Sequence, residues 1–185
     1  MLKNKRIAAL ITDGYHHGEL TGTMKALTDE GATVTVVSLK PEHLSAGVLD
    51  HITYKLPDEM KPKERLKADR LIGAVAAAEF DALFIPGGHS PGTLRVTPEA
   101  LKLTLDFYAQ RKPIATLCRG PQVLISAGIV NGKDMTSAGS VADDLKNAGA
   151  IFLNLPLVVD GNIITSRSME DLDQFNKALI DALNS

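Results

Sequence analysis

The strongest structural signal in the chain is IATLCRGP, which occupies residues 114–121. Its first four residues suit a short buried strand, and the Gly-Pro pair then opens a helix. A strand that runs directly into a helix is typical of open α/β sheets, whose ligands bind beyond the carboxyl ends of the strands. The pattern therefore predicts a mostly parallel sheet with Cys118 at its functional edge.

The rest of the chain alternates in the same way between short apolar runs and amphipathic stretches, which favours a sheet covered by helices. The predicted strands are 6–12, 33–38, 52–56, 82–85, 114–117 and 135–137, with a two-residue hairpin joining 157–160 to 163–166. The predicted helices are 19–30, 66–78, 98–110, 141–148 and 169–183, with one more beginning at Pro121. Residues 40–78 form an irregular, insertion-like part of a single predicted domain, 1–185.

Composition excludes several classes of protein. The formal net charge of −2 offers no basic face for nucleic acid, since the basic residues between 61 and 70 are interleaved with acidic ones. No apolar run reaches the ~18–20 residues that span a bilayer, and the first apolar run is too short for a signal peptide. The single cysteine cannot form an internal disulfide, which favours a reducing compartment. We therefore expect a cytoplasmic protein without nucleic-acid or membrane partners.

Cys118 is the strongest candidate for chemistry. Nucleophile elbows place a Ser or Cys on a turn of this kind, near helix N-terminal amides that favour the reactive thiolate. We therefore expect a pKa below the ordinary value of ~8.5 for this thiol. The alternative is a buried apolar cysteine, which is common in protein cores. The position at a strand end and the RGP sequence that follows favour function.

Two other strand ends carry candidate site residues. The loop 86–92 begins with Pro-Gly-Gly, and two adjacent glycines let the main chain approach a neighbouring strand closely and turn its amides toward an anion. It is either an oxyanion hole or a plain turn. Glu19 follows the first strand and is either a general acid or base, or an acidic residue in the first turn of a helix. Spacing alone favours the helix-turn interpretation for Glu19.

The histidines give no metal signal. His16 and His17 are adjacent and do not share a helix face, and the chain has no HExxH, CxxC or acidic loop. We expect these two residues and His89 at the rim of the site, with no metal and no cofactor. The chain also lacks GxxxxGK[ST], and no GxGxxG follows the first strand, which argues against nucleotide binding.

Nearly the whole chain outside 40–78 resembles the PfpI superfamily, which takes in intracellular protease I, bacterial general stress proteins and the parkinsonism-associated deglycase. The matching segments are 79–89 (EFDALFIPGGH), 112–122 (KPIATLCRGPQ), 124–128, 143–144, 147–150, 158–162 and 165–167. The resemblance implies a flavodoxin-like three-layer sandwich of the class I glutamine amidotransferase type, usually a homodimer. It also implies that Cys118 is the nucleophile, Glu19 its acidic partner, and the backbone amides of Gly88 and Arg119 the oxyanion hole.

One departure from the family pattern affects mechanism. The protease-like branch has His directly after the nucleophile, where this chain has Arg119. Arginine cannot release a proton at physiological pH, so it cannot act as a general base. This difference weakens the prediction of a peptidase.

Three functions remain open at this point. The first is a thiol enzyme acting on reactive carbonyls, of the glyoxalase or deglycase type, with Glu19 moving protons. The second is a stress-response protein in which peroxide oxidises Cys118, with no second cysteine to resolve the product. The third is the peptidase. The small-molecule partner is accordingly a carbonyl compound or a peroxide.

Overall fold

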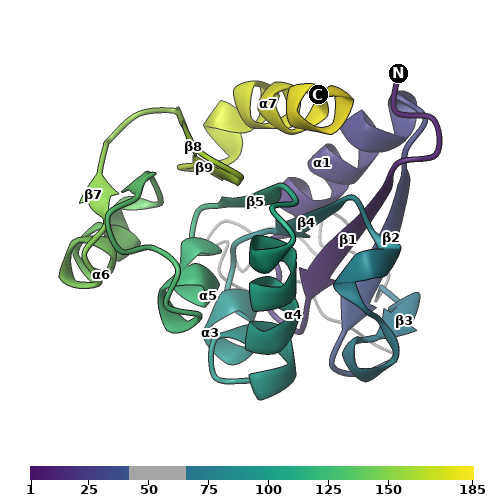
Figure 1. Cartoon of the computed structure of the whole chain (residues 1–185), viewed down its shortest axis with the longest axis horizontal. Coiled ribbons are helices and arrows are strands. Elements are labelled where there is room, and N and C mark those ends of the chain that lie inside the picture. Colours follow the sequence, from purple (N-terminus) through teal and green to yellow (C-terminus); the bar gives the residue numbers. More distant parts are fainter. Residues whose placement is uncertain (42–65) are drawn as a thin grey trace, which may run out of the picture.

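A computed structural model describes residues 1–41 and 66–185 of the chain. Within these residues the main sheet has seven strands in the order β3-β2-β1-β4-β5-β9-β8 (Figure 1). All neighbours pair in parallel except β8 and β9, which form an antiparallel hairpin. The strands are β1 (Arg6–Ile11), β2 (Thr33–Ser38), β3 (Arg70–Leu71), β4 (Ala82–Ile85), β5 (Ile114–Leu117), β8 (Leu157–Asp160) and β9 (Ile163–Ser166).

Helices cover both faces of this sheet. One side carries α1 and α7, and the other carries α3, α4 and α5 (Figure 1). A small parallel pair, β6 (Asp134–Met135) and β7 (Ile151–Phe152), lies beside α6. The helices are α1 (His17–Asp29), α3 (Ser90–Leu94), α4 (Pro98–Ala109), α5 (Pro121–Ser126), α6 (Ala142–Asn147) and α7 (Leu172–Asn184). Short 3₁₀ helices occupy Ile72–Ala74, Ala77–Glu79, Gly139–Val141 and Met169–Asp171.

The alternation of side chains along a strand explains the three layers. Ile7 and Ile11 of β1 pack in one apolar cluster with the buried side chains of α1 and α7. Leu10 of the same strand packs in the other cluster, with Phe107 of α4. Because both faces are buried, the central strands have continuous apolar sequences. The predicted flavodoxin-like sandwich is confirmed.

Most element predictions are confirmed closely. The strands 33–38, 82–85 and 114–117 and both arms of the hairpin have the predicted bounds. The other helices and strands differ by a few residues at their ends or begin with a 3₁₀ turn. The predicted strand 52–56 lies outside the described residues.

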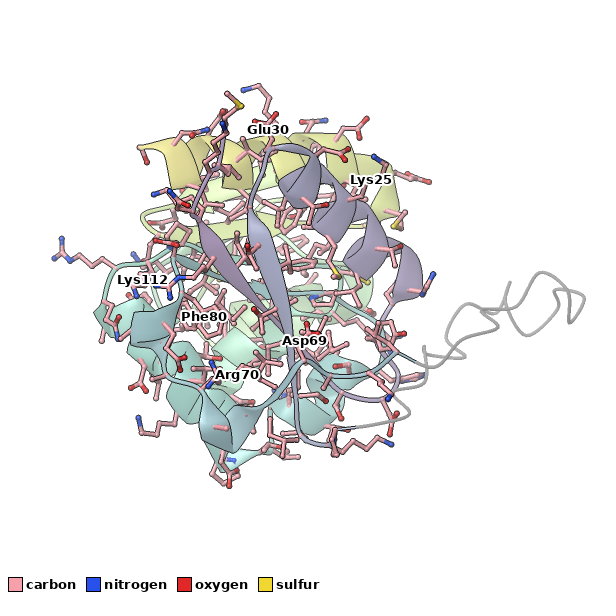
Figure 2. All side chains as sticks on the ribbon, turned by 90° about the vertical axis from the view of Figure 1, so that its right-hand side faces the viewer. Lys25, Glu30, Asp69, Arg70, Phe80 and Lys112 are labelled. Carbon is pink, nitrogen blue, oxygen red and sulfur yellow. The ribbon has the colours of Figure 1, made fainter. Side chains whose placement is uncertain are left out.

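The predicted helix 66–78 is wrong. The backbone there pairs with the sheet: Arg70 lies in register with Val37, and the Asp69 carboxylate accepts a hydrogen bond from Val36 N at 2.7 Å (Figure 2). The Arg70 guanidinium then donates to Glu79 at 2.5 Å, which holds the following residues in two 3₁₀ turns. Tertiary hydrogen bonds to an open sheet edge thus override the helix propensity of the alanines. Among the described residues, no helix has the length and apolar character needed to cross a bilayer.

The topology determines where the site forms. β1, β4 and β5 are adjacent and parallel, so their carboxyl ends lie at one edge of the sheet. The segments that follow these ends contain Glu19 in the first turn of α1, Gly88 and Cys118, although about 100 residues separate the first from the last in sequence. A functional site is therefore expected at the edge of the sheet where β1, β4 and β5 end.

Candidate active site

Cys118 lies on a strained turn at the end of β5. Its φ is 57°, in the left-handed region that non-glycine residues rarely adopt. The turn is fixed on both sides, because Cys118 N donates to Ser166 O at 3.2 Å and Ala138 N donates to Cys118 O at 2.9 Å. This geometry holds the thiol above the carboxyl edge of the sheet, as in a nucleophile elbow.

Glu19 lies against this thiol. Its side chain is almost fully buried, and Gly87 N donates to Glu19 Oε2 at 2.7 Å. A Cβ added at Gly87 would stand 2.9 Å from both Glu19 Oε2 and Cys118 Sγ. Only a glycine therefore leaves room for the carboxyl group and the sulfur on either side of the β4 strand end. Gly87 was not among the predicted site residues, although the pair Gly87-Gly88 was the signal for it in the sequence.

Gly88 is held in a conformation that suits glycine. Its φ is 86°, and an added Cβ would collide with Gly14 O and stand 2.7 Å from His16 N. The loops after β1 and β4 are joined there by His16 N donating to Gly87 O at 3.0 Å and His89 N donating to Gly14 O at 2.7 Å. These backbone contacts direct the Gly88 amide toward the cysteine.

The electrostatics of Cys118 differ from the sequence-based expectation. Burial is the main reason why the pKa of the thiol is raised to about 12, and the nearby Glu19 carboxylate adds to the rise by charge repulsion and by accepting a hydrogen bond. Backbone N–H groups of Gly88 and Arg119 act in the opposite direction, because they donate to the sulfur and lower the pKa. The expected lowering is wrong, since desolvation and a carboxylate outweigh two amides and a short helix.

The three histidines occupy different positions around the site. His16 caps α1, with its Nδ1 accepting from Glu19 N at 3.2 Å, and it lines the pocket above Cys118. His17 is exposed, and its ring lies 6.4 Å from that of Tyr15. His89 is also exposed, and partial desolvation together with the Arg119 charge lowers its pKa. The structure thus places His16 in the pocket wall, whereas His17 and His89 are not among the residues that line it.

An open pocket of about 380 Å³ gives access to Cys118. It brings together residues from the β1, β4, β5 and β9 strand ends and from the segment after β6. Its lining is His16, Glu19, Gly88, Cys118, Arg119, Ala138, Ser140, Ser168, Met169 and Glu170. The sequence did not indicate the last three or Ala138 and Ser140, because nothing local marks a loop that reaches a distant strand end. No cluster of three or more His, Cys, Asp or Glu side chains suited to a metal occurs in residues 1–41 and 66–185.

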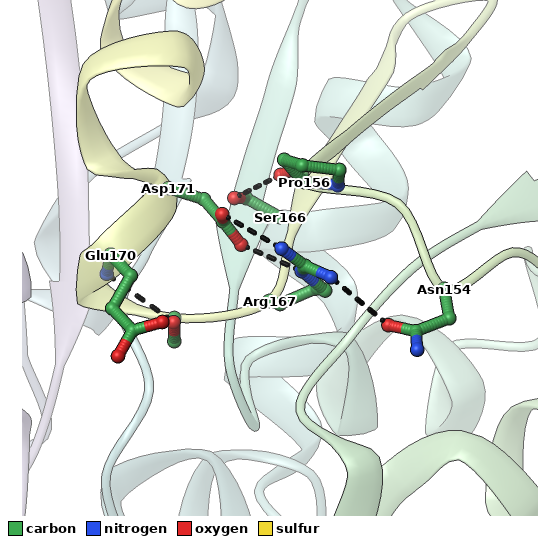
Figure 3. A network of polar contacts seen from close by, with 7 residues as sticks. Asn154, Pro156, Ser166, Arg167, Glu170 and Asp171 are labelled. Carbon is green, nitrogen blue, oxygen red and sulfur yellow. Dashed lines mark hydrogen bonds and ion pairs between the residues drawn. The ribbon is translucent and has the colours of Figure 1, made fainter.

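The pocket wall after β9 is supported by an ion-pair network. Arg167 lies between Asp171 and Asn154 and donates to them at 2.8 Å and 3.2 Å (Figure 3). Both Asp171 oxygens accept from the guanidinium, and the Asp171 side chain is buried. A bidentate pair of this kind holds a fixed geometry. It therefore fixes the intervening segment, Ser168 to Glu170, against the pocket.

The model of the DJ-1/PfpI family matches residues 5–182. The chain belongs to this family. Among curated relatives, the putative cysteine protease YraA of Bacillus subtilis is 37% identical over 97% of this chain and 99% of its own length. Protein/nucleic acid deglycase 2 of Escherichia coli is 34% identical, with coverage of 98% and 99%.

Solved structures agree with the family assignment. The DJ-1/ThiJ/PfpI-like part of a two-domain protein from Anabaena variabilis superposes with a TM-score of 0.88 at 32% identity, over 98% of this chain and 48% of that one. DJ-1beta of Drosophila melanogaster gives a TM-score of 0.83 at 23% identity, with coverage of 98% and 91%. Because its identity is below 25%, the second similarity is one of fold.

The pKa of Cys118 provides a direct test of its contact with Glu19. Glu19→Gln removes the negative charge that raises this pKa, so the titration midpoint of the thiol should move to lower pH. Each unit of this shift increases the thiolate population at pH 8 about tenfold. We expect faster alkylation by iodoacetamide at pH 8. Because the midpoint lies above pH 10, the ratio of the variant and wild-type rates at each pH from 6 to 10 gives the shift of the midpoint.

A matched control is Glu170→Gln, which removes a carboxylate from the same pocket. Glu170 is exposed, so water screens its charge and its removal should shift the midpoint less. A midpoint that rises in Glu19→Gln would contradict the argument, because it would mean that a protonated Glu19 stabilises the thiolate.

Proposed function

We propose that this protein is a cysteine-dependent enzyme of the glyoxalase or deglycase type that acts on reactive carbonyl compounds. The observation that supports this proposal best is the contact between Cys118 and Glu19 beneath an open pocket, with two amides donating to the sulfur. The name of the Escherichia coli relative, a deglycase, supports the same reaction class.

The first step is addition of Cys118 to the aldehyde carbon of a 2-oxoaldehyde. Glu19 takes the thiol proton as the C–S bond forms, because its carboxylate already accepts that hydrogen bond. A raised thiol pKa suits this arrangement, since the buried pair keeps a single negative charge while the proton moves between them. The carbonyl electron pair passes to oxygen, which the amides of Gly88 and Arg119 stabilise until Glu19 transfers the thiol proton to it and becomes a carboxylate again.

The second step moves a proton within the hemithioacetal. A carboxylate at Glu19 removes the proton from the former aldehyde carbon and returns it to the adjacent carbonyl carbon, which gives a thioester of a 2-hydroxy acid. The aldehyde carbon is oxidised and its neighbour is reduced, so no external redox partner is required. Water then cleaves the C–S bond and releases the hydroxy acid and the Cys118 thiol. With an adduct between an amine and an oxoaldehyde, the C–N bond breaks as the C–S bond forms, and the amine leaves with the thiol proton that Glu19 has taken.

The electrostatics favour this reaction over the alternatives. Peroxide reacts with a thiolate, and burial and Glu19 disfavour that form of Cys118 in the resting protein. The protease-like branch has a histidine directly after the nucleophile, and Arg119 at that position cannot take its place as a general base. A homodimer and a cytoplasmic location stay predictions from the sequence.

Proton NMR of the protein mixed with methylglyoxal tests the proposal. We expect catalytic formation of lactate, many equivalents per protein chain, without added thiol or metal. The same spectra follow the loss of methylglyoxal, so adduct formation and turnover are separated. A stoichiometric adduct on Cys118 without lactate would contradict the enzyme and leave a cysteine that only reacts once.

A further inference from the structure

Arg119 combines two features that the reaction above does not use. It lines the pocket next to the nucleophile, and its guanidinium is always charged. Within the part of the chain that the structure describes, no carboxylate forms an ion pair with it, although the other arginine beside the pocket, Arg167, is paired with Asp171. Its positive charge also acts on the imidazole of His89, where it contributes to the lowered pKa of that side chain.

The other charges of the pocket are negative. The Glu19 carboxylate already accepts hydrogen bonds from Gly87 N and from the Cys118 thiol. Glu170 is exposed to water, so its charge is screened. An anionic group on a substrate would therefore be repelled by Glu19 and attracted by Arg119.

We infer that the Arg119 side chain binds an anionic group, a carboxylate above all, attached close to the carbonyl that Cys118 attacks. In this proposal the backbone N–H of Arg119 donates a hydrogen bond to the reacting oxygen, and its guanidinium donates to the neighbouring anion. A guanidinium fork matches a carboxylate with two parallel hydrogen bonds. The inference rests on the proposed function, since it gives the addition step of that reaction a preference for aldehydes that carry an anionic group close to the reacting carbon over neutral ones.

The subsite can be tested without any carbonyl chemistry. Iodoacetate and iodoacetamide alkylate the same thiol and differ mainly in one negative charge. We expect the ratio of their rates at Cys118, relative to the ratio for free cysteine, to favour iodoacetate. Arg119→Gln keeps the backbone N–H and should lower this ratio about tenfold, the effect of losing one charge-assisted contact. Arg119→Lys keeps the charge and should restore part of the ratio.

Arg111→Gln is the matched control for net charge. Arg111 is exposed and precedes β5, so it lies at the opposite edge of the sheet from Cys118. Its replacement should change the ratio less than twofold. Equal ratios in the wild type and in Arg119→Gln would overturn the inference, and an equal drop in Arg111→Gln would also overturn it, because net charge would then explain the preference.

A second measurement separates this inference from the proposed function. Glyoxylate and methylglyoxal are small aldehydes, the first anionic and the second neutral, and each should protect Cys118 from alkylation by forming a hemithioacetal. The wild type should favour glyoxylate, and Arg119→Gln should reduce that preference. If neither aldehyde protects Cys118, the proposed function fails, and the alkylation ratio still decides whether Arg119 binds anions. If both protect equally in both proteins, the inference fails and the reaction stands.

Discussion

Replacing Cys118 with serine is expected to lower kcat/KM for methylglyoxal by about a thousandfold or more. Serine keeps the size of the side chain and the backbone turn, but its hydroxyl is a far weaker acid and nucleophile than a thiol. Glu19 would have to remove a proton that burial makes still harder to release. Loss of the nucleophile removes the covalent step itself, which is the largest effect that a single side chain can have on such a reaction.

The measurement is steady-state loss of methylglyoxal, with thermal unfolding recorded for the same preparations. An unchanged unfolding temperature would assign the loss to chemistry. If Cys118→Ser retained more than a tenth of the wild-type rate, the covalent mechanism would be wrong and the pocket would act through Glu19 alone.

Gly88→Ala is expected to have the largest effect on stability, a loss of about 3 kcal/mol or more in the free energy of unfolding. The residue has a φ of 86°, and the added Cβ would meet backbone atoms of Gly14, Tyr15 and His16. Backbone atoms cannot rotate away as the end of a side chain can, so the loops after β1 and β4 would have to separate. The Gly88 amide would then no longer point at Cys118, and activity should fall with stability.

The control is Gly92→Ala in α3, only four residues later. A Cβ at Gly92 meets no atom within 4 Å, so this change should stay within about 0.5 kcal/mol of the wild type. Urea denaturation at constant pH measures both variants. Similar midpoints for the two alanine variants would show that the loop after β4 can relax, and the claim that Gly88 is required for the fold would be lost.

The sequence alone determined the elements whose signals are local. A run such as 114–117, apolar on both faces, is diagnostic of a buried central strand, and the two-residue turn at 161–162 sets the hairpin between β8 and β9. Cys118 could be placed at a strand end because the residues on both sides of it carry that information. The region 66–78 could not be predicted, since its alanines favour a helix, whereas pairing of Arg70 and Leu71 with the edge of β2 prevents a continuous helix there.

The tertiary structure alone decided how the site works. No spacing in the sequence shows that Gly87 stands between Glu19 and Cys118, or that Ser168 to Glu170 form a wall of the same pocket. The direction of the Cys118 pKa also depends on the fold, because the cost of burial and the distance to a carboxylate are properties of the packed state. Local sequence specifies which residues can do chemistry, whereas the order of β1, β4 and β5 in the sheet specifies which of them meet.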